Sequence, residues 1–412
     1  MKILFLTNLL PYPLDNGGKI KTYTTLQGLS RAGHCVDLVC FTEDKMGIND
    51  VPIELSRICN RVEQTFLRLT TAENRKYMMQ VAMRSLFSKF SFGVYKYKSQ
   101  DMFLKLKELS ESVQYDYIYY DHLQMCIYKP YSDTLFPGCI TVLDEHNCET
   151  LIMLRNAQNS SNVAKKLFLY LEAYKLRYFE ARCLTTVDAS IVLSQEDYRM
   201  LRELCKDDFP HKVIPIGIQD RGIKKDTPID GKGLNILFVG TLTWEPNNKG
   251  MQWFLREVVP LLDERDFQYT LYIVGKNPSR ELEELIGLHE NIILTGYVDS
   301  VDEYYDKCHC MIVPLFIGSG QRVKIIEAFS KGMPVISTSI GAEGLHYSHG
   351  DNILIADNAD EFVRNIVAIS EEQRKRISVM GRQTYEEHYS PRAVQAKIVE
   401  VIDCTINCNI HK

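Results

Sequence analysis

The feature that most constrains this chain is a regular alternation of short apolar segments with helical stretches. Residues 3–7 form an apolar run, residues 19–31 show the apolar spacing of a helix, and residues 36–41 form the next apolar run. This β-α-β order predicts a parallel sheet with helices on both faces. Further strands are predicted along the first half of the chain, at residues 117–120, 140–143 and 189–193.

The same series starts again in the second half. The run NILFVG within residues 234–240 resembles the opening run KILFLT, and it too leads through a loop into a helical stretch, residues 250–262. More predicted strands follow at residues 270–275, 292–295, 311–315 and 335–338. We therefore predict an α/β protein made of two doubly wound, Rossmann-like domains facing a cleft, where ligands meet the carboxyl ends of the strands.

Chain length and local composition predict the domain boundaries. A chain of 412 residues is too long for one ordinary core, and residues 216–232 are polar and rich in glycine, as linkers are. We expect an N-terminal Rossmann-like domain at residues 1–215 and a second Rossmann-like domain at residues 216–390. Residues 391–412 are expected to form a helix that packs back on the N-terminal domain.

Composition excludes several classes of protein. The net charge of -5 argues against a partner made of duplex nucleic acid, and no apolar run approaches the ~20 residues that span a bilayer. The opening MKILFLTNLL reads as a buried strand rather than a signal peptide, and the 12 cysteines show no disulfide spacing.

Cys308, His309 and Cys310 alternate along a strand, so they cannot all face one metal. We expect a cytoplasmic protein, with peripheral contact at the inner face of the membrane left open.

Residues 75–107 differ from their surroundings. They contain eight Lys or Arg and one acidic residue, interleaved with aromatic side chains. One interpretation is helices whose solvated lysines cover the edge of a core. The other is a surface that meets anionic lipid or a phosphate-bearing acceptor.

Two glycine-containing loops stand where anions are often bound. Gly17 and Gly18 follow the first strand and open the first helix, and Gly240 ends the first strand of the second half. Backbone N–H groups at such helix starts can hold a phosphate, although a tight turn needs the same residues. Lys249 lies beside the following helix and would add positive charge, although an isolated lysine is more often solvated.

The segment IGSGQRVKIIEAFSKG carries the most chemistry. Gly318 and Gly320 form a turn, and Arg322, Lys324 and Glu327 lie on the opening turns of a helix. Positions three apart share a helix face, so a lysine suited to a diphosphate lies next to a carboxylate suited to ribose hydroxyls. A surface ion pair worth a few tenths of a kcal/mol is the alternative. Apolar neighbours favour a buried helix, in which both charges need a partner.

This segment resembles the donor-site motif of family-4 glycosyltransferases of the GT-B fold, in the branch with the pattern Gly-Ser-Gly-x-Arg-x-Lys. The resemblance extends to the opening strand with its glycine pair and to the run TGYVDSVDEYYDKCHCMIVPL. It implies that Glu327 binds ribose and that Lys249 binds diphosphate, with Arg322 or Lys324 as the second positive group. It also implies that residues 1–215 form the acceptor-side domain and residues 216–390 the nucleotide-sugar-binding domain. The first glutamate of the family's usual pair falls at Ser319 here.

The resemblance also implies an activity. It suggests a retaining, metal-independent hexosyltransferase that uses a UDP- or GDP-sugar donor, a glycan, lipid-linked or other hydroxyl acceptor, and no cofactor. The expected setting is the synthesis of surface polysaccharide or glycoconjugates. No Asp-x-Asp metal motif is present, and the positive charge of Lys324 would stabilise the leaving diphosphate in place of a metal.

Two polar clusters end strands of the first half, YYDHLQM and VLDEHNCET. Family members place a catalytically important His, or an Asp-His pair, at a comparable strand end. His146 is the better candidate, Asp144 is the second, and His122 is weaker. Alternatively, His146 is a loop residue at a helix entry with Asn147 as the N-cap.

Two other functions remain open at this point. One is a different GT-B enzyme, such as an epimerase or a hydrolase, and the other is a catalytically silent nucleotide-sugar-binding protein. A nicotinamide-dependent enzyme is disfavoured, because no Gly-x-Gly-x-x-Gly follows either opening strand.

Overall fold

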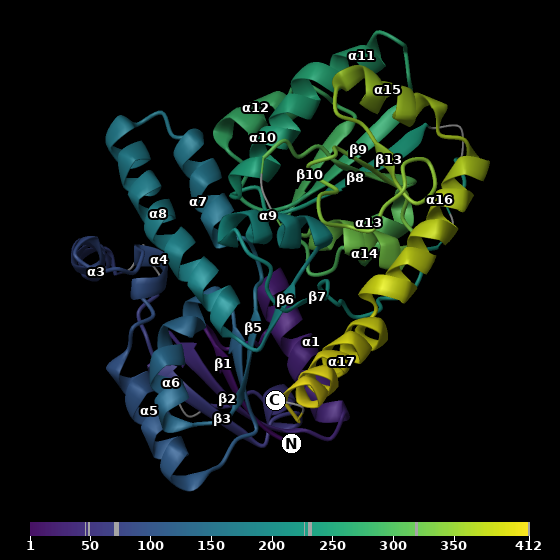
Figure 1. The fold of residues 1–412 in the computed structure, drawn as a ribbon. Helices are drawn as coiled ribbons and strands as arrows, with labels where there is room; N and C mark the ends of the chain where they lie inside the picture. The colour runs from purple at the N-terminus through teal and green to yellow at the C-terminus, as the bar shows by residue number, and fades with distance from the viewer. Residues whose placement is uncertain are drawn as a thin grey trace. The chain divides into compact units, whose positions relative to one another are not determined.

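The computed structural model describes residues 1–45, 47, 50–69, 74–225, 227–229, 233–317 and 320–410. The chain forms two compact units (Figure 1). The first consists of Met1–Gly217 with Val394–Lys412, and the second is Ile218–Ala393. The Ser319 and Gly318 positions of the predicted donor turn lie outside the described residues.

The first unit is built on a seven-stranded parallel sheet of order β3-β2-β1-β4-β5-β6-β7. Because the chain runs outward from β1 in one direction and from β4 in the other, the sheet has a topological switch point between these two strands. The strands are β1 (Lys2–Thr7), β2 (Cys35–Thr42), β3 (Arg61–Phe66), β4 (Tyr117–Asp121), β5 (Ile140–Asp144), β6 (Ala189–Val192) and β7 (His211–Val213).

Helices cover both faces of this sheet (Figure 1). They are α1 (Gly17–Arg31), α2 (Ile53–Ser56), α3 (Arg75–Leu86), α4 (Phe92–Tyr95), α5 (Gln100–Ser112), α6 (Lys129–Leu135), α7 (Glu149–Gln158), α8 (Val163–Thr186), α9 (Gln195–Cys205) and α17 (Pro391–Ile410). The last of these joins the core of the first unit, where Val394 and Ile398 pack with the side chains of β1 and α1. Tyr117 of β4 also donates a hydrogen bond to the carbonyl of Ile402 at 2.8 Å.

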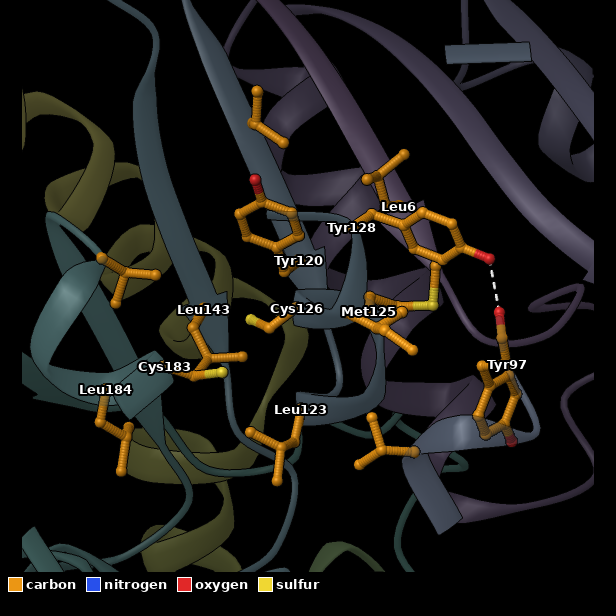
Figure 2. Close-up of a cluster of buried hydrophobic side chains, with 14 of the residues drawn as sticks. Leu6, Tyr97, Tyr120, Leu123, Met125, Cys126, Tyr128, Leu143, Cys183 and Leu184 are labelled. Carbon is orange, nitrogen blue, oxygen red and sulfur yellow. Dashed lines mark hydrogen bonds between the residues drawn. The ribbon is translucent and has the colours of Figure 1, made fainter. Parts of the chain in front are cut away.

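A second part of this core holds the segment that follows β4. The 3-10 helix η1 (Leu123–Tyr128) is buried throughout its apolar positions, and Figure 2 shows its side chains packed against Tyr120 and Leu143 of the neighbouring strands. The hydroxyl of Tyr128 donates to the carbonyl of Tyr97. The end of β4 is therefore continued by a buried 3-10 helix.

The second unit repeats the plan with a six-stranded parallel sheet of order β10-β9-β8-β11-β12-β13, whose switch point lies between β8 and β11. Its strands are β8 (Leu234–Val239), β9 (Tyr269–Val274), β10 (Ile292–Gly296), β11 (Cys310–Val313), β12 (Val335–Ser337) and β13 (Leu354–Ile355). Its helices are α10 (Glu245–Trp253), α11 (Val259–Asp263), α12 (Arg280–Ile286), α13 (Asp302–Lys307), α14 (Val323–Lys331), α15 (Ala359–Ala368) and α16 (Glu371–Thr384).

Two parallel, doubly wound sheets confirm the predicted α/β fold class. The helix expected at residues 250–262 begins earlier, at Glu245, because Pro246 is well suited to a first helical turn. It also contains a π-helical turn, Phe254–Val258, before α11. Within the described part of the chain, no helix has the length and hydropathy required to cross a bilayer.

Candidate functional site

The second unit brings three residues together at its switch point. Gly240 follows β8, Asn247 lies on α10, and Lys324 lies on α14 after β11. The ammonium of Lys324 donates to Asn247 Oδ1 at 2.8 Å and lies 4.7 Å from the ring centroid of Phe238. A Cβ at Gly240 would come within 2.7 Å of both Lys324 Nζ and Asn247 Nδ2. Glycine is therefore required at position 240 for the lysine to occupy this place.

The environment of Lys324 favours an anionic ligand. Burial, with a further contribution from the charge of Arg322, lowers the pKa of Lys324 to about 7, against the opposing effect of Glu327. A desolvated lysine amine is protonated most readily when an anion lies beside it. Arg322 itself is buried, donates to the carbonyl of Gly320 at 2.9 Å, and stands 5.8 Å from the ring centroid of Trp244.

Glu327 lies on α14, three residues after Lys324. Its side chain is 20% exposed, and its Oε1 is 3.7 Å from the guanidinium of Arg221. Burial raises the pKa of Glu327, while the charges of Arg221 and Lys324 oppose that shift. The carboxylate can accept hydrogen bonds from a ligand's hydroxyl groups, as the sequence predicts for ribose.

Lys249, the other predicted diphosphate ligand, has a different environment. Its side chain is 58% exposed, and its ammonium pairs with Glu245 at 2.6 Å, four residues away on α10. The α10 side chain that contacts Lys324 is the buried Asn247, which the sequence did not single out. A buried asparagine at a helix start is an ordinary local feature, so no sequence signal marks it.

The first unit has a polar cluster at its own switch point, where β4 ends beside β1. Asp121 is fully buried, and its Oδ1 accepts from His146 Nε2 at 2.9 Å. Its Oδ2 lies 3.0 Å from His122 Nδ1 and accepts from the hydroxyls of Thr7 and Thr22, each at 2.7 Å. The carboxylate therefore orients both imidazoles.

The two histidine rings are stacked, with centroids 3.6 Å apart. A Cβ at Gly18 would lie 3.5 Å from His122 Nε2 and 4.0 Å from His146 Nδ1. The ring nitrogens that do not face Asp121 thus converge on Gly18, in the first turn of α1. His122 adopts a positive φ of 77°, and its side chain is 13% exposed against 5% for His146.

The charges within this cluster are unequal. Burial disfavours a charged His122, but the carboxylate of Asp121 outweighs it and raises the pKa of His122. Burial and the neighbouring charges of His122 and Lys21 lower the pKa of His146 to about 4. Burial would raise the pKa of Asp121, yet both histidines hold it well below its usual range. His122 is therefore the ring that is more readily converted to the imidazolium, and His146 is the one that more readily stays neutral.

Both carboxylate oxygens of Asp144, the second predicted catalytic residue, have a partner within the protein. One oxygen forms an ion pair with the buried Lys21 of α1, and the other accepts from the hydroxyl of Tyr119 at 2.7 Å. The backbone carbonyl of Asp144 also accepts from the N–H of His122 at 3.0 Å. Lys21 was missed in the sequence, because a lysine on a helix is usually solvated.

Potential metal ligands are also present in this cluster. One ligand atom from each of Asp121, His122 and His146 lies within 4.8 Å of the others. Both imidazoles face the same carboxylate, so a metal ion would have to replace their hydrogen bonds and bind neutral rings. That the activity needs no metal stays a prediction.

Comparisons with known proteins agree with this architecture. Residues 233–372 match the family model described as glycosyl transferases group 1. An uncharacterized 44.6 kDa protein in the cps region of Klebsiella pneumoniae is 25% identical over 407 residues, covering 96% of this chain and 98% of that protein.

Solved structures share the fold at lower identity. Sucrose-phosphate synthase from Thermosynechococcus elongatus superposes with a TM-score of 0.69 at 16% identity, covering 99% of each chain. HepE from Anabaena, in complex with UDP-glucose, superposes with a TM-score of 0.62 at 15% identity, covering 98% of this chain and 100% of that one. Residues 233–372, which contain Gly240, Asn247 and Lys324 (the Lys324 cluster), therefore match a glycosyl transferases group 1 domain, and the chain has the two-domain GT-B fold.

Proposed function

We propose that this protein is a retaining glycosyltransferase that moves a hexose from a nucleotide-diphosphate sugar to a hydroxyl acceptor. The observation that carries the proposal is the Lys324 cluster. A desolvated lysine with a lowered pKa lies at a sheet switch point, inside the domain that matches a glycosyltransferase family.

The donor half of the mechanism rests on α14 and its neighbours. In this proposal Lys324 and Arg322 offset the charge of the diphosphate, and Glu327 accepts hydrogen bonds from the ribose. As the sugar–phosphate bond breaks, negative charge grows on the leaving diphosphate, and fixed cations stabilise it without reorganisation. The HepE complex with UDP-glucose supports a UDP-sugar, while a GDP-sugar remains an alternative donor.

Lys249 is less well placed to bind the diphosphate than Lys324 and Arg322. Its ammonium would have to leave Glu245 to reach a diphosphate, at little cost because surface pairs contribute about 0–1 kcal/mol. We therefore keep Lys249 as a secondary contact. The main positive charge is assigned to Lys324.

The acceptor half rests on the first unit. We assign the acceptor hydroxyl to the space beside Gly18, which both histidines face. His122 positions the hydroxyl, and His146 orients Asp121, which orients His122. Asp144 acts indirectly in this proposal, because Lys21 and Tyr119 occupy its carboxylate. Retention through front-face attack follows from the family resemblance.

The biological setting is proposed from the relative in the cps region of Klebsiella pneumoniae. We infer an acceptor in the synthesis of surface polysaccharide or a glycoconjugate, with a glycan or lipid-linked hydroxyl. No nucleic acid partner and no cofactor are part of the proposal.

Donor binding and turnover can be tested with one set of variants. Thermal shift and calorimetry against UDP, GDP, ADP and their sugars identify the base, because a site-specific ligand raises apparent stability. Lys324→Ala and Glu327→Ala should each weaken binding, whereas Lys307→Ala, an exposed lysine of the same unit, should not. Wild-type affinity in both site variants would refute the assignment.

Product analysis separates the alternatives. A glycosyltransferase forms a new glycosidic product only when an acceptor is present. An epimerase changes the donor without an acceptor, and a hydrolase releases free sugar from it. Tight nucleotide binding with no turnover across a broad acceptor screen would identify a silent nucleotide-sugar-binding protein instead.

A further inference from the structure

Two neighbouring helices of the first unit expose apolar side chains along one face each. On α8, an unbroken stripe follows the i, i+4 spacing of a helix face and runs for ~22 Å. Its members are 39–71% exposed: Val163, Leu167, Tyr170, Leu171, Tyr174 and Tyr178. On α3, Met79, Met83 and Leu86, with Phe87 just beyond, are 37–91% exposed. Soluble monomers rarely leave so many large apolar groups together in water.

The two faces form one surface, because α3 and α8 are joined directly. Lys175 of α8 donates to the carbonyls of Ser85 and Leu86 at the end of α3, at 2.8 and 3.2 Å. Just after α3, Phe90 packs edge-to-face on Phe179 of α8, with ring centroids 5.5 Å apart. Figure 1 shows α3 and α4 beside α8. We call the exposed side chains of these two faces the α3/α8 surface.

The exposed charges of α8 and of residues 74–100 have one sign. Residues 74–100 contain no Asp or Glu, and Arg75, Lys76, Arg84 and Lys89 are exposed there. Helix α8 has only two acidic residues, Glu172 and Glu180, and both are buried, while Lys165, Arg177 and Arg182 are exposed. The carboxylate of Glu172 accepts from the N–H of Phe92, so it is turned inward.

A pocket lies beside the same surface. Its volume is about 520 Å³, and Phe90, Tyr178 and Phe179 form part of its apolar wall. Lys89, Lys129 and Arg182 also line it, and Lys129 forms an ion pair with Asp133 at 3.0 Å. Asp133 lines the pocket as well, so its three cationic side chains and one carboxylate leave a net positive charge. A mainly apolar pocket with this charge matches an amphiphile that carries a phosphate.

We propose that the α3/α8 surface docks on an anionic lipid bilayer, with the adjoining pocket receiving a phosphate head group. Apolar side chains enter the interfacial region, and the surrounding cations pair with anionic lipids. A second copy of this chain fits poorly, because the like-charged rims of two such faces would meet. The proposal goes beyond the glycosyl transfer reaction and does not depend on it.

Vesicle flotation of the full-length protein tests this proposal without any activity measurement. We expect binding to vesicles of phosphatidylcholine with phosphatidylglycerol and weaker binding to phosphatidylcholine alone. Binding to the anionic vesicles should decrease with added salt, because dissolved ions shorten the range of the attraction between opposite charges. The triple variant Arg75→Gln, Lys76→Gln, Lys89→Gln should lower partitioning on the order of 100-fold at low salt.

Substitutions of exposed apolar side chains test the hydrophobic contribution to membrane binding. Met83→Ser with Phe87→Ser, and Leu167→Ser with Tyr174→Ser, should each reduce partitioning by about tenfold or more. The matched control is Leu288→Ser with Val379→Ser, which changes side chains of similar exposure, 75% and 65%, in the second unit. Unchanged circular dichroism and nucleotide affinity verify that each variant is folded.

Three results would overturn the proposal. The first is equal partitioning of the wild type onto neutral and anionic vesicles. The second is wild-type partitioning by the folded α3 and α8 variants. The third is a wild-type dimer in light scattering that these variants convert to a monomer, which would make a second copy the occupant of the surface.

Discussion

The lowered pKa of Lys324 predicts that nucleotide diphosphate binding depends on pH above neutrality. Burial brings this pKa to about 7, so in the ligand-free protein the ammonium loses its proton as the pH rises past that value. A bound diphosphate favours the charged form and raises the pKa again. Binding at alkaline pH must therefore take up a proton.

The magnitude follows from the fraction of protein that is protonated before binding. With a pKa of about 7, roughly one quarter of the lysines are charged at about pH 7.5, and roughly one hundredth at about pH 9. If only the charged form binds, Kd rises by about 20-fold between these two values. A lysine with an ordinary pKa near ~10.4 would leave Kd almost unchanged over that interval.

Isothermal titration calorimetry with UDP measures both the Kd and the number of protons taken up on binding. Kd gives the pH profile, and titrations in buffers of different ionisation enthalpy count the protons taken up. Lys324→Arg is the matched control, because a guanidinium stays charged throughout and should bind with little dependence on pH. A wild-type Kd that is constant from about pH 7.5 to 9, without proton uptake, would refute the reasoning.

Further substitutions test other parts of the two sites. Gly240→Ala should displace the Lys324 ammonium and weaken UDP binding by at least tenfold in calorimetry, while a thermal midpoint near that of the wild type would show an intact fold. Glu327→Gln keeps the shape but weakens ribose binding, so Kd for UDP should rise about tenfold, with no matching loss for inorganic diphosphate. Lys249→Ala should raise Kd by only a few-fold, and a loss as large as that of Lys324→Ala would make it the main diphosphate ligand. His122→Gln should reduce kcat on the order of 100-fold with donor Kd unchanged; a larger effect of His146→Gln at equal stability would exchange their proposed roles.

Local patterns in the sequence were enough to predict the architecture. The spacing of apolar residues predicted ten of the thirteen strands that the structure describes, because a buried parallel strand needs a short continuous apolar run wherever it lies. The other three, β3, β7 and β13, were not predicted, because β3 is largely polar and β7 and β13 have only three and two residues. The start of α10 was predicted too late, since its first turn contains polar residues and a proline, which give no apolar period. The split pattern of two β-α series also predicted two domains.

The candidate sites were predicted only in part. Gly240, Arg322, Lys324 and Glu327 could be proposed because each belongs to a short motif beside a strand end. Asn247 could not, because it meets Lys324 across 77 residues of sequence. In the same way, the pairing of Lys21 with Asp144 spans 123 residues. Asp144 was singled out at its strand end, but Lys21 looks like an ordinary surface charge when read alone.

Sequence by itself determined the fold class, the helix start that carries Lys324 and Glu327, and the excess of cations between residues 75 and 107. Tertiary structure decided which groups are desolvated and therefore have shifted pKa values, that both histidines face Gly18 at the start of α1, and which apolar stripe of α8 remains exposed. Helix α8 has apolar residues on more than one side, so periodicity could not choose its buried face. The physical reason is that backbone conformation follows from neighbours in sequence, whereas burial and charge pairing depend on residues that only the folded chain brings together.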